Sequence, residues 1–231
     1  MSPTASESVV IAAAIFACFL GSRLAAVDRR GRASATVATA AATSAAGRIV
    51  NNESSEIIRM FNSAFDGVGA TPGDFYPAEL RADIDALNDR IYSTVNNGVY
   101  RSGFARSQRA YEEAARALFS TLDWLEERLA MHRWLCGERL TEADWRLFAT
   151  LIRFDAVYVG HFKCNIRRIA DYRNLSRYLR DLYNQPGVAD TVNFLHIKRH
   201  YYTSHPQLNP SGIVPLGPEL DLLDDPGTVV A

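Results

Sequence analysis

Hydrophobic residues recur at helical spacing from residue 80 onward, and this pattern constrains the fold more than any other feature of the chain. A first stripe consists of Leu80, Ile84, Leu87, Ile91 and Val95 and is followed by the turn signal Asn96-Asn97-Gly98. A longer stripe consists of Tyr111, Ala115, Leu118, Leu122, Leu125 and Leu129. Because this spacing places apolar side chains on one face of an α-helix, both segments predict amphipathic helices that pack against each other.

A capping box marks the start of a third helix. Thr141-Glu142-Ala143-Asp144 comes directly before the apolar residues Trp145, Phe148, Leu151 and Ile152. The Thr141 hydroxyl can cap this helix while the Asp144 carboxylate accepts the N–H of Thr141, and Leu140 can pack on Trp145 as a hydrophobic staple. We expect the start of this helix to be buried and to organise the core.

Breaker residues divide the rest of the chain. A cluster of Gly67, Gly69, Pro72 and Gly73 predicts a domain boundary, and everything beyond it as far as His200 has helical character. One more helix should contain Leu175, Tyr178, Leu179 and Leu182 and end before Pro186-Gly187, and a final helix should run from residue 188 to 200. Prolines and glycines dominate from Pro206 onward, so we expect a loosely ordered tail.

A short strand and a helix start lie ahead of this boundary. The apolar pair Ile49 and Val50 is followed by a polar turn and then by Glu53 and Ser54, where a further helical pattern begins. Free backbone N–H groups and partial positive charge at a helix N-terminus can hold a ligand that bears a carboxylate and an ammonium, such as the γ-glutamyl end of glutathione. A simple helix cap explains the same two residues.

The first 47 residues differ in composition from the remainder. Residues 9–20 are continuously apolar, and several arginines and a tract rich in Ala, Ser and Thr follow them. The apolar run is shorter than the ~20 residues of a typical membrane-spanning helix. We expect a disordered leader and a cytoplasmic protein, and an organelle transit peptide for plastid or mitochondrion remains the alternative, as do a signal anchor and an error in the gene model.

Charge and cysteine usage exclude several classes of function. The net charge is −1, from 25 basic and 26 acidic residues, so no electrostatic bias favours nucleic acid or an anionic membrane. Three cysteines, Cys18, Cys136 and Cys164, are too few and too scattered for a disulfide framework or a zinc site. His196 and His200 share a helix face, but the cations Lys198 and Arg199 lie between them, so we expect no metal.

The strand-helix unit and the helical bundle together resemble the glutathione transferase fold. Four segments in the same order, residues 97–105, 158–165, 196–202 and 209–215, are similar to those of glutathionyl-hydroquinone reductases, the xi class of that superfamily. The resemblance covers residues 48 to about 218. It implies a mainly α fold with a remnant of a thioredoxin-like domain at 48–66 and a glutathione transferase C-terminal helical domain at 74–205, whereas composition predicts the leader at 1–47 and the tail at 206–231.

The resemblance also implies a reaction and its residues. In these reductases a cysteine thiolate attacks the sulfur of a glutathionyl-hydroquinone, the free hydroquinone leaves, and a second glutathione resolves the mixed disulfide. Tyr100 would be the proton donor and acceptor beside the ring, and Tyr158 and Tyr201 would lower the pKa of the thiolate. Glu53 and Ser54 would hold the γ-glutamyl group, and the backbone of Val50 would pair with glutathione, the co-substrate. Hydroquinone-type conjugates and a second copy of the chain are the other expected partners.

The sequence departs from that pattern at the nucleophile. The family uses a Cys-Pro-Trp motif, but this chain contains no Cys-Pro dipeptide, and Cys18 lies in the apolar run before Phe19. Whether the chain is an enzyme therefore stays open. The alternatives are a non-catalytic helical module for binding or assembly, and an incomplete gene model of an active reductase.

Overall fold

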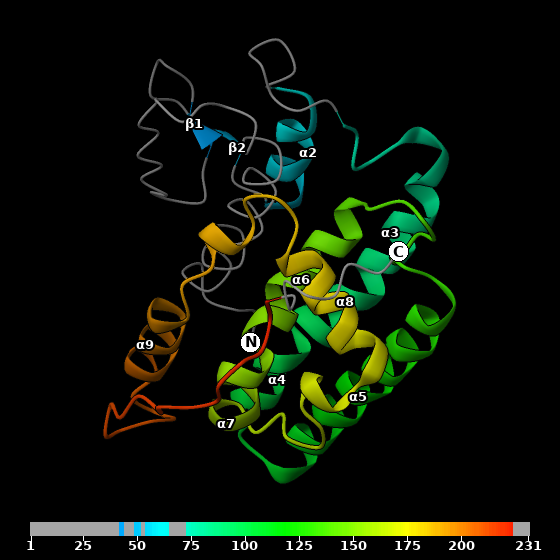
Figure 1. Cartoon of the computed structure of the whole chain (residues 1–231). Coiled ribbons are helices and arrows are strands. Elements are labelled where there is room, and N and C mark those ends of the chain that lie inside the picture. The colour runs from blue at the N-terminus through cyan, green and yellow to red at the C-terminus, as the bar shows by residue number, and fades with distance from the viewer. Residues whose placement is uncertain (1–41, 44–48, 52–53, 65–72, 224–231) are drawn as a thin grey trace.

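The computed structural model describes residues 42–43, 49–51, 54–64 and 73–223, and the architecture is mainly helical (Figure 1). Strands β1 (Ala42–Thr43) and β2 (Ile49–Asn51) pair antiparallel, with Ala42 opposite Asn51. Helix α2 (Ser54–Ala64) follows β2 directly. The mainly α fold is confirmed. The predicted leader lies outside the described residues except at 42–43.

The helical bundle begins beyond residue 73. Its α-helices are α3 (Arg81–Ile91), α4 (Gly98–Gly103), α5 (Gln108–Met131), α6 (Glu142–Arg153), α7 (Val159–His161), α8 (Arg173–Tyr183) and α9 (Phe194–Ser204). Short 3₁₀ turns occur at η2 (Ala78–Leu80), η5 (Ile169–Asp171) and η6 (Ala189–Thr191). Two π-helical turns, η3 (Tyr92–Asn96) and η4 (Phe154–Tyr158), extend α3 and α6. In the described part of the chain no helix is both long and apolar enough to cross a bilayer.

Helix α5 is the longest helix among the described residues and lies beside α4 and α8 (Figure 1). Its first turn is capped by Ser107, whose hydroxyl oxygen accepts the N–H of Ala110 at 3.2 Å. The predicted stripe faces the core, where Leu118, Leu122 and Leu125 have no exposed surface. The spacing of hydrophobic residues therefore identified both the helix and its buried face.

The predicted capping box of α6 is formed. One carboxylate oxygen of Asp144 accepts the Thr141 N–H at 2.8 Å and the Thr141 hydroxyl at 2.9 Å. The other accepts the N–H of Leu135 at 2.8 Å and the hydroxyl of Tyr178 in α8 at 2.9 Å. Trp145, which follows, is completely buried. A single carboxylate thus ties the start of α6 to the preceding loop and to α8, in the centre of the core.

Two helix boundaries differ from the sequence prediction. Gly98 does not end a helix, because the chain continues through the π turn η3 and Gly98 opens α4 instead. The final helix starts at Phe194 rather than at residue 188, since the side chain of Asn193 accepts the N–H of His196 at 3.0 Å and caps it there. The described part of the tail has no helix or strand, yet Leu222 is buried and its carbonyl accepts the Asn184 side-chain amide at 2.8 Å.

Candidate functional site

Three tyrosines from separate elements meet in the core of the bundle. Tyr100 lies in α4, Tyr158 at the end of η4 and Tyr201 in α9. The hydroxyl oxygens of Tyr100 and Tyr201 are 2.7 Å apart, and those of Tyr158 and Tyr201 are 2.9 Å apart. Each of the three side chains is at most 4% exposed. The three predicted tyrosines therefore form one hydrogen-bonded group, which we call the phenol cluster.

Aromatic packing fixes the rings of the phenol cluster. Phe162 stacks on Tyr158 with ring centroids 5.4 Å apart and an interplanar angle of 14°. It also contacts Tyr100 at 5.3 Å between centroids. A Cβ atom on Gly103 would lie 2.3 Å from the ring of Phe162, so only glycine allows α4 to approach this closely. Gly103, which lies in the segment 97–105, thus allows Phe162 to pack against Tyr100.

The phenol cluster has more hydrogen-bond donors than short hydrogen bonds within it. Each tyrosine hydroxyl carries one proton, so the cluster has three donors. Its two short hydrogen bonds use two of them, and the hydroxyls of Tyr100 and Tyr158 interact only weakly with each other. The third O–H group can therefore turn to another acceptor, such as an oxygen or sulfur atom of a ligand.

Burial keeps the phenols of Tyr100 and Tyr158 protonated. It raises the pKa of Tyr100 and that of Tyr158 well above the ordinary value of 10. The neighbouring phenol of Tyr201 raises both pKa values further, whereas the positive charge of Arg153 lowers both. At neutral pH Tyr100 and Tyr158 are therefore proton and hydrogen-bond donors rather than phenolates.

Both π turns lie next to a cluster tyrosine. In η3 the N–H of Asn97 donates to the carbonyl of Tyr92 at 2.9 Å, and α4 with Tyr100 begins at the next residue. In η4 the N–H of Val159 donates to the carbonyl of Phe154, and Tyr158 ends that turn. A π turn shifts the residues beyond it around the helix axis, and such turns are frequent at functional sites. The hydrophobic spacing gave no sign of either one.

The predicted glutathione-side residues are described only in part. Val50 lies in β2, and Ser54 is the first residue of α2, as expected for a helix start. Glu53 lies outside the described residues. The role of these three residues in holding glutathione stays a prediction.

An ionic junction connects α2 to the bundle, and the sequence analysis missed it. The guanidinium of Arg59 contacts both carboxylate oxygens of Glu142 at 3.0–3.2 Å and Asp85 at 2.6 Å. Glu142 is 1% exposed and also accepts the side-chain amide of Asn88 at 3.0 Å. Burial opposes the charge on Arg59, but the hydrogen bonds and negative charge of Glu142, followed by those of Asp85, raise its pKa.

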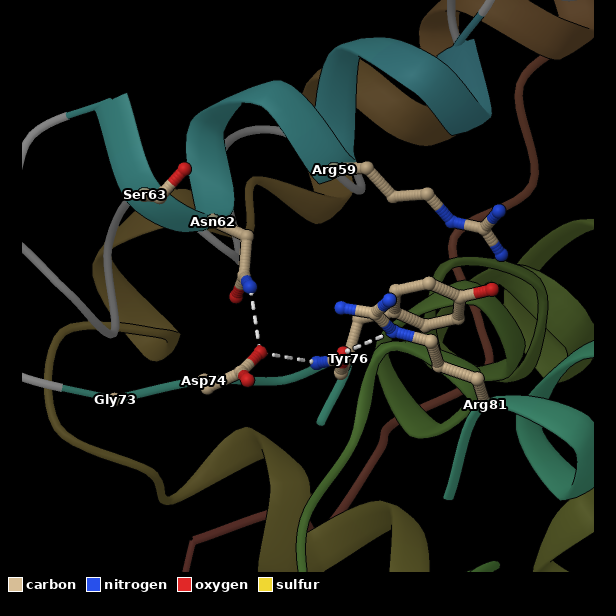
Figure 2. Close-up of a pocket in the computed structure, with 7 residues that line it drawn as sticks. All are labelled: Arg59, Asn62, Ser63, Gly73, Asp74, Tyr76 and Arg81. Atoms are coloured by element: carbon tan, nitrogen blue, oxygen red, sulfur yellow. Dashed lines mark hydrogen bonds between the residues drawn. The ribbon is translucent and has the colours of Figure 1, made fainter. Parts of the chain in front are cut away.

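A polar pocket of about 340 Å³ lies at the same junction. Its lining residues are Arg59, Asn62, Ser63, Gly73, Asp74, Tyr76 and Arg81. Figure 2 shows the guanidinium groups of Arg59 and Arg81 beside the ring of Tyr76, at 3.9 and 5.1 Å from its centroid. Asp74 accepts the side-chain amide of Asn62 at 2.6 Å. These contacts hold α2 against the start of the bundle, and the pocket shares no lining residue with the phenol cluster.

The cysteines that the structure describes are not suited to nucleophilic attack. Cys164 is completely buried, and burial raises the pKa of its thiol to about 12. Burial also raises the pKa of Cys136. Cys18 lies outside the described residues.

Four of the five histidines fall into two pairs. His196 and His200 lie in α9, and no cluster of three potential metal ligands occurs within the ranges that the structure describes. His161 and His205 instead form a buried pair, with Nε2 of the first 3.1 Å from Nδ1 of the second. This pair joins the end of α7 to the residue that follows α9, close to Tyr201.

Comparison with known proteins places this geometry in a family. A family model described as "Glutathione S-transferase, C-terminal domain" matches residues 108–181. The chain is 67% identical over 171 residues to the glutathionyl-hydroquinone reductase PcpF of Sphingobium chlorophenolicum, covering 74% of this chain and 55% of that protein. The chain therefore spans about half the length of the curated relatives it matches.

Solved structures agree with the sequence matches. The glutathione-bound structure of YqjG from Escherichia coli K-12 has a TM-score of 0.75 at 58% identity, over 77% of this chain and 57% of that one. The Xi glutathione S-transferase of Phanerochaete chrysosporium has a TM-score of 0.71 at 57% identity, over 75% and 57%. A putative glutathione S-transferase of Corynebacterium glutamicum has a TM-score of 0.80 at 41% identity, over 93% and 73%. This chain belongs to the glutathione transferase family, and its close homologues are glutathionyl-hydroquinone reductases and xi-class enzymes.

Proposed function

We propose that this chain forms the aromatic-substrate half of a glutathione-dependent reductase of glutathionyl-hydroquinones. The observation that carries the proposal is the phenol cluster, in which Tyr100, Tyr158 and Tyr201 share two hydrogen bonds and keep one donor in reserve. A hydroquinone hydroxyl has the same donor and acceptor capacity as a tyrosine hydroxyl, so it can join this network. The surrounding aromatic rings provide the apolar walls that such a ring needs.

The cluster has a defined part in the reaction. When a thiolate attacks the glutathionyl sulfur, the bond between sulfur and the ring breaks and the aromatic fragment leaves with the electron pair. That fragment must take up a proton, and a buried protonated tyrosine can supply it. Tyr100 is the proton donor in this scheme, and Tyr158 and Tyr201 are the phenols that lower the pKa of the thiolate.

The names of the relatives support the choice of ligands. PcpF is a glutathionyl-hydroquinone reductase, and the YqjG structure contains glutathione. We propose glutathione as co-substrate of this chain, with Val50, Glu53 and Ser54 on its glutathione side, and hydroquinone-type conjugates as substrates. A homodimer is a further expectation, which sedimentation of the purified protein tests.

The chemistry also sets a limit on this chain alone. Phenols can tune a thiolate, but they cannot replace its exchange with a sulfur atom. The sequence has no Cys-Pro dipeptide, and Cys164 is buried with a raised pKa. We therefore propose that the chain binds its aromatic ligand but turns over the conjugate at a negligible rate.

Two measurements test the proposal on the purified 231-residue chain. Calorimetric titration with a hydroquinone should give saturable binding that weakens about tenfold in Tyr201→Phe, because this change removes the hub of the network. The matched control is Tyr92→Phe, since Tyr92 is 51% exposed and lies outside the cluster. Incubation with glutathionyl-hydroquinone and glutathione should give no turnover. Turnover that Cys164→Ser abolishes would contradict the assignment.

A further inference from the structure

Arg153 is a buried cation beside the phenol cluster. It is the last residue of α6 and is 6% exposed. One Nη1–H group donates to the carbonyl of Ala149 at 2.6 Å, but Nε is buried and has no hydrogen-bond partner. A guanidinium has five N–H donors, so most of its capacity is unused.

No carboxylate neutralises this cation in the part of the chain that the structure describes. The carboxylate of Asp155, two residues further on, accepts the backbone N–H groups of Ile169 and Ala170 at 2.7 and 3.0 Å. The ion pairs of the described residues do not include Arg153. An uncompensated buried charge is costly, so it favours an anion that can enter and pair with it.

The π turn η4 determines on which side of the helix the Arg153 side chain lies relative to Tyr158. Arg153 comes directly before η4, and Tyr158 ends that turn, five residues later. In a π turn, residues five apart lie nearly above one another, so Arg153 and Tyr158 fall on the same side of the helix. The guanidinium therefore extends from the turn that Tyr158 ends, and its positive charge lowers the pKa of both Tyr158 and Tyr100.

We propose that Arg153 is a positioning residue that stabilises the phenolate form of an aromatic ligand bound at the phenol cluster. The inference rests on the proposed function, because it assigns the charge state of the ligand at that same site. The reserve tyrosine O–H donates to the phenolate oxygen, and the guanidinium supplies the balancing charge. The proton of the ring hydroxyl moves to the sulfur-bearing carbon, the carbon–sulfur bond breaks with its electron pair passing to the ring oxygen, and the resulting phenolate is held until Tyr100 protonates that oxygen.

A purely structural role is the competing explanation. An arginine in the last turn of a helix commonly bonds the terminal carbonyls, as Arg153 does with Ala149. Such a role would affect all ligands equally, whereas a charge role would affect only anions. The two explanations are separated by a phenolate and a neutral molecule of nearly the same shape.

The probes are 4-nitrophenol and its methyl ether, 4-nitroanisole, measured on the full chain. Absorbance titration gives the pKa of bound 4-nitrophenol, and calorimetry at a pH where the free probe is ionised gives both affinities. We expect the wild-type protein to lower the pKa of the bound probe by about one unit, equivalent to about tenfold tighter binding of the phenolate. Arg153→Gln should remove this shift and weaken 4-nitrophenolate about tenfold, with 4-nitroanisole unchanged.

Two control variants distinguish the effect of losing the positive charge from a general effect of substitution on folding. Arg153→Lys keeps the charge and should retain most of the pKa shift, and the exposed Arg116→Gln should behave as wild type, since its side chain is 77% exposed. If Arg153→Gln weakens both probes equally, or a folded Arg153→Lys shows no shift, the role of Arg153 is wrong and the proposed function stands. If neither probe binds the wild-type protein, both proposals fall.

Discussion

At the scale of the residue, Tyr201 is the hub of the phenol cluster. Its hydroxyl takes part in both hydrogen bonds, whereas Tyr100 and Tyr158 each take part in one. A buried hydroxyl that loses its partner costs about 1–3 kcal/mol. Removing the hydroxyl at each of the three positions therefore leaves a different number of buried hydroxyls without a partner, although all three residues are tyrosines.

This asymmetry predicts a difference between two matched variants. Tyr201→Phe leaves the hydroxyls of Tyr100 and Tyr158 both unpaired, whereas Tyr158→Phe leaves Tyr201 still bonded to Tyr100. We expect Tyr201→Phe to lower the free energy of unfolding by about 1 kcal/mol more than Tyr158→Phe does. Urea denaturation of the two variants measures the difference. Equal losses would mean that water, rather than the neighbouring phenol, satisfies these groups.

At the scale of the element, Asp144 does more than cap α6. Its carboxylate accepts four hydrogen bonds, from the Thr141 N–H and hydroxyl, the Leu135 N–H and the Tyr178 hydroxyl. Asp144→Ala should cost more than about 3 kcal/mol of unfolding free energy, because it leaves several buried donors unpaired. Thr141→Ala should cost about 1 kcal/mol, the usual value of a cap. Thermal and urea unfolding compare them, and similar losses would show that only capping matters.

The histidine pair predicts how the junction of α7 and α9 responds to pH. Burial, followed by the charges of His205 and Lys163, lowers the pKa of His161 from 6.5 to about 4. The unfolded chain therefore takes up a proton at this histidine near pH 6.5, while the folded chain does so only near pH 4. It follows that the free energy of unfolding decreases as the pH falls through this interval.

Denaturation at several pH values tests this linkage. His161→Gln should flatten the pH dependence, and the exposed His132→Gln serves as the matched control that should keep the wild-type slope. An unchanged slope in His161→Gln would assign the effect to other groups.

The elements differ in how well the sequence predicted them. Apolar spacing identified α3, α5, α6 and α8, and the capping box located the start of α6 to the residue. The π turns and the Asn193 cap of α9 were missed, because each depends on a local backbone choice that leaves the hydrophobic pattern nearly unchanged. The meeting of Tyr100, Tyr158 and Tyr201 could not come from periodicity, since residues 43 to 101 positions apart are involved. Only the family resemblance singled out these residues.

At the scale of the whole molecule, the feature to explain is how α2 stays attached to the bundle. Helix α2 buries Ile57 and Ile58, and Arg59 reaches across to Glu142, 83 positions away. No sequence pattern links two residues this far apart, which explains why the junction was missed. Glu142 is the first residue of α6 and follows the N-cap Thr141, so the junction also contacts the start of α6. The ion pair is therefore one of two contacts, with the buried Ile57 and Ile58, that hold α2 against the bundle.

Arg59→Met should loosen α2 without unfolding the bundle. The change leaves Glu142, which is 1% exposed, with only Asn88 and the more distant Arg146 at 3.5 Å as polar partners. Because the Arg59 side chain is itself 34% exposed, we expect a loss of about 1–3 kcal/mol rather than the full cost of breaking a buried pair. Hydrogen exchange should show faster exchange of the α2 amides while those of α5 keep their protection.

The exposed pair of Arg168 and Asp171, 2.6 Å apart, provides the matched control. Arg168→Met should have little effect on the free energy of unfolding and leave the exchange of α2 unchanged, since a surface ion pair contributes little. If α2 exchanges at the same rate in Arg59→Met as in the wild-type protein, its docking depends on Ile57 and Ile58 alone. In that case the glutathione side would be held by apolar contact, and the buried charge of Glu142 would serve only the start of α6.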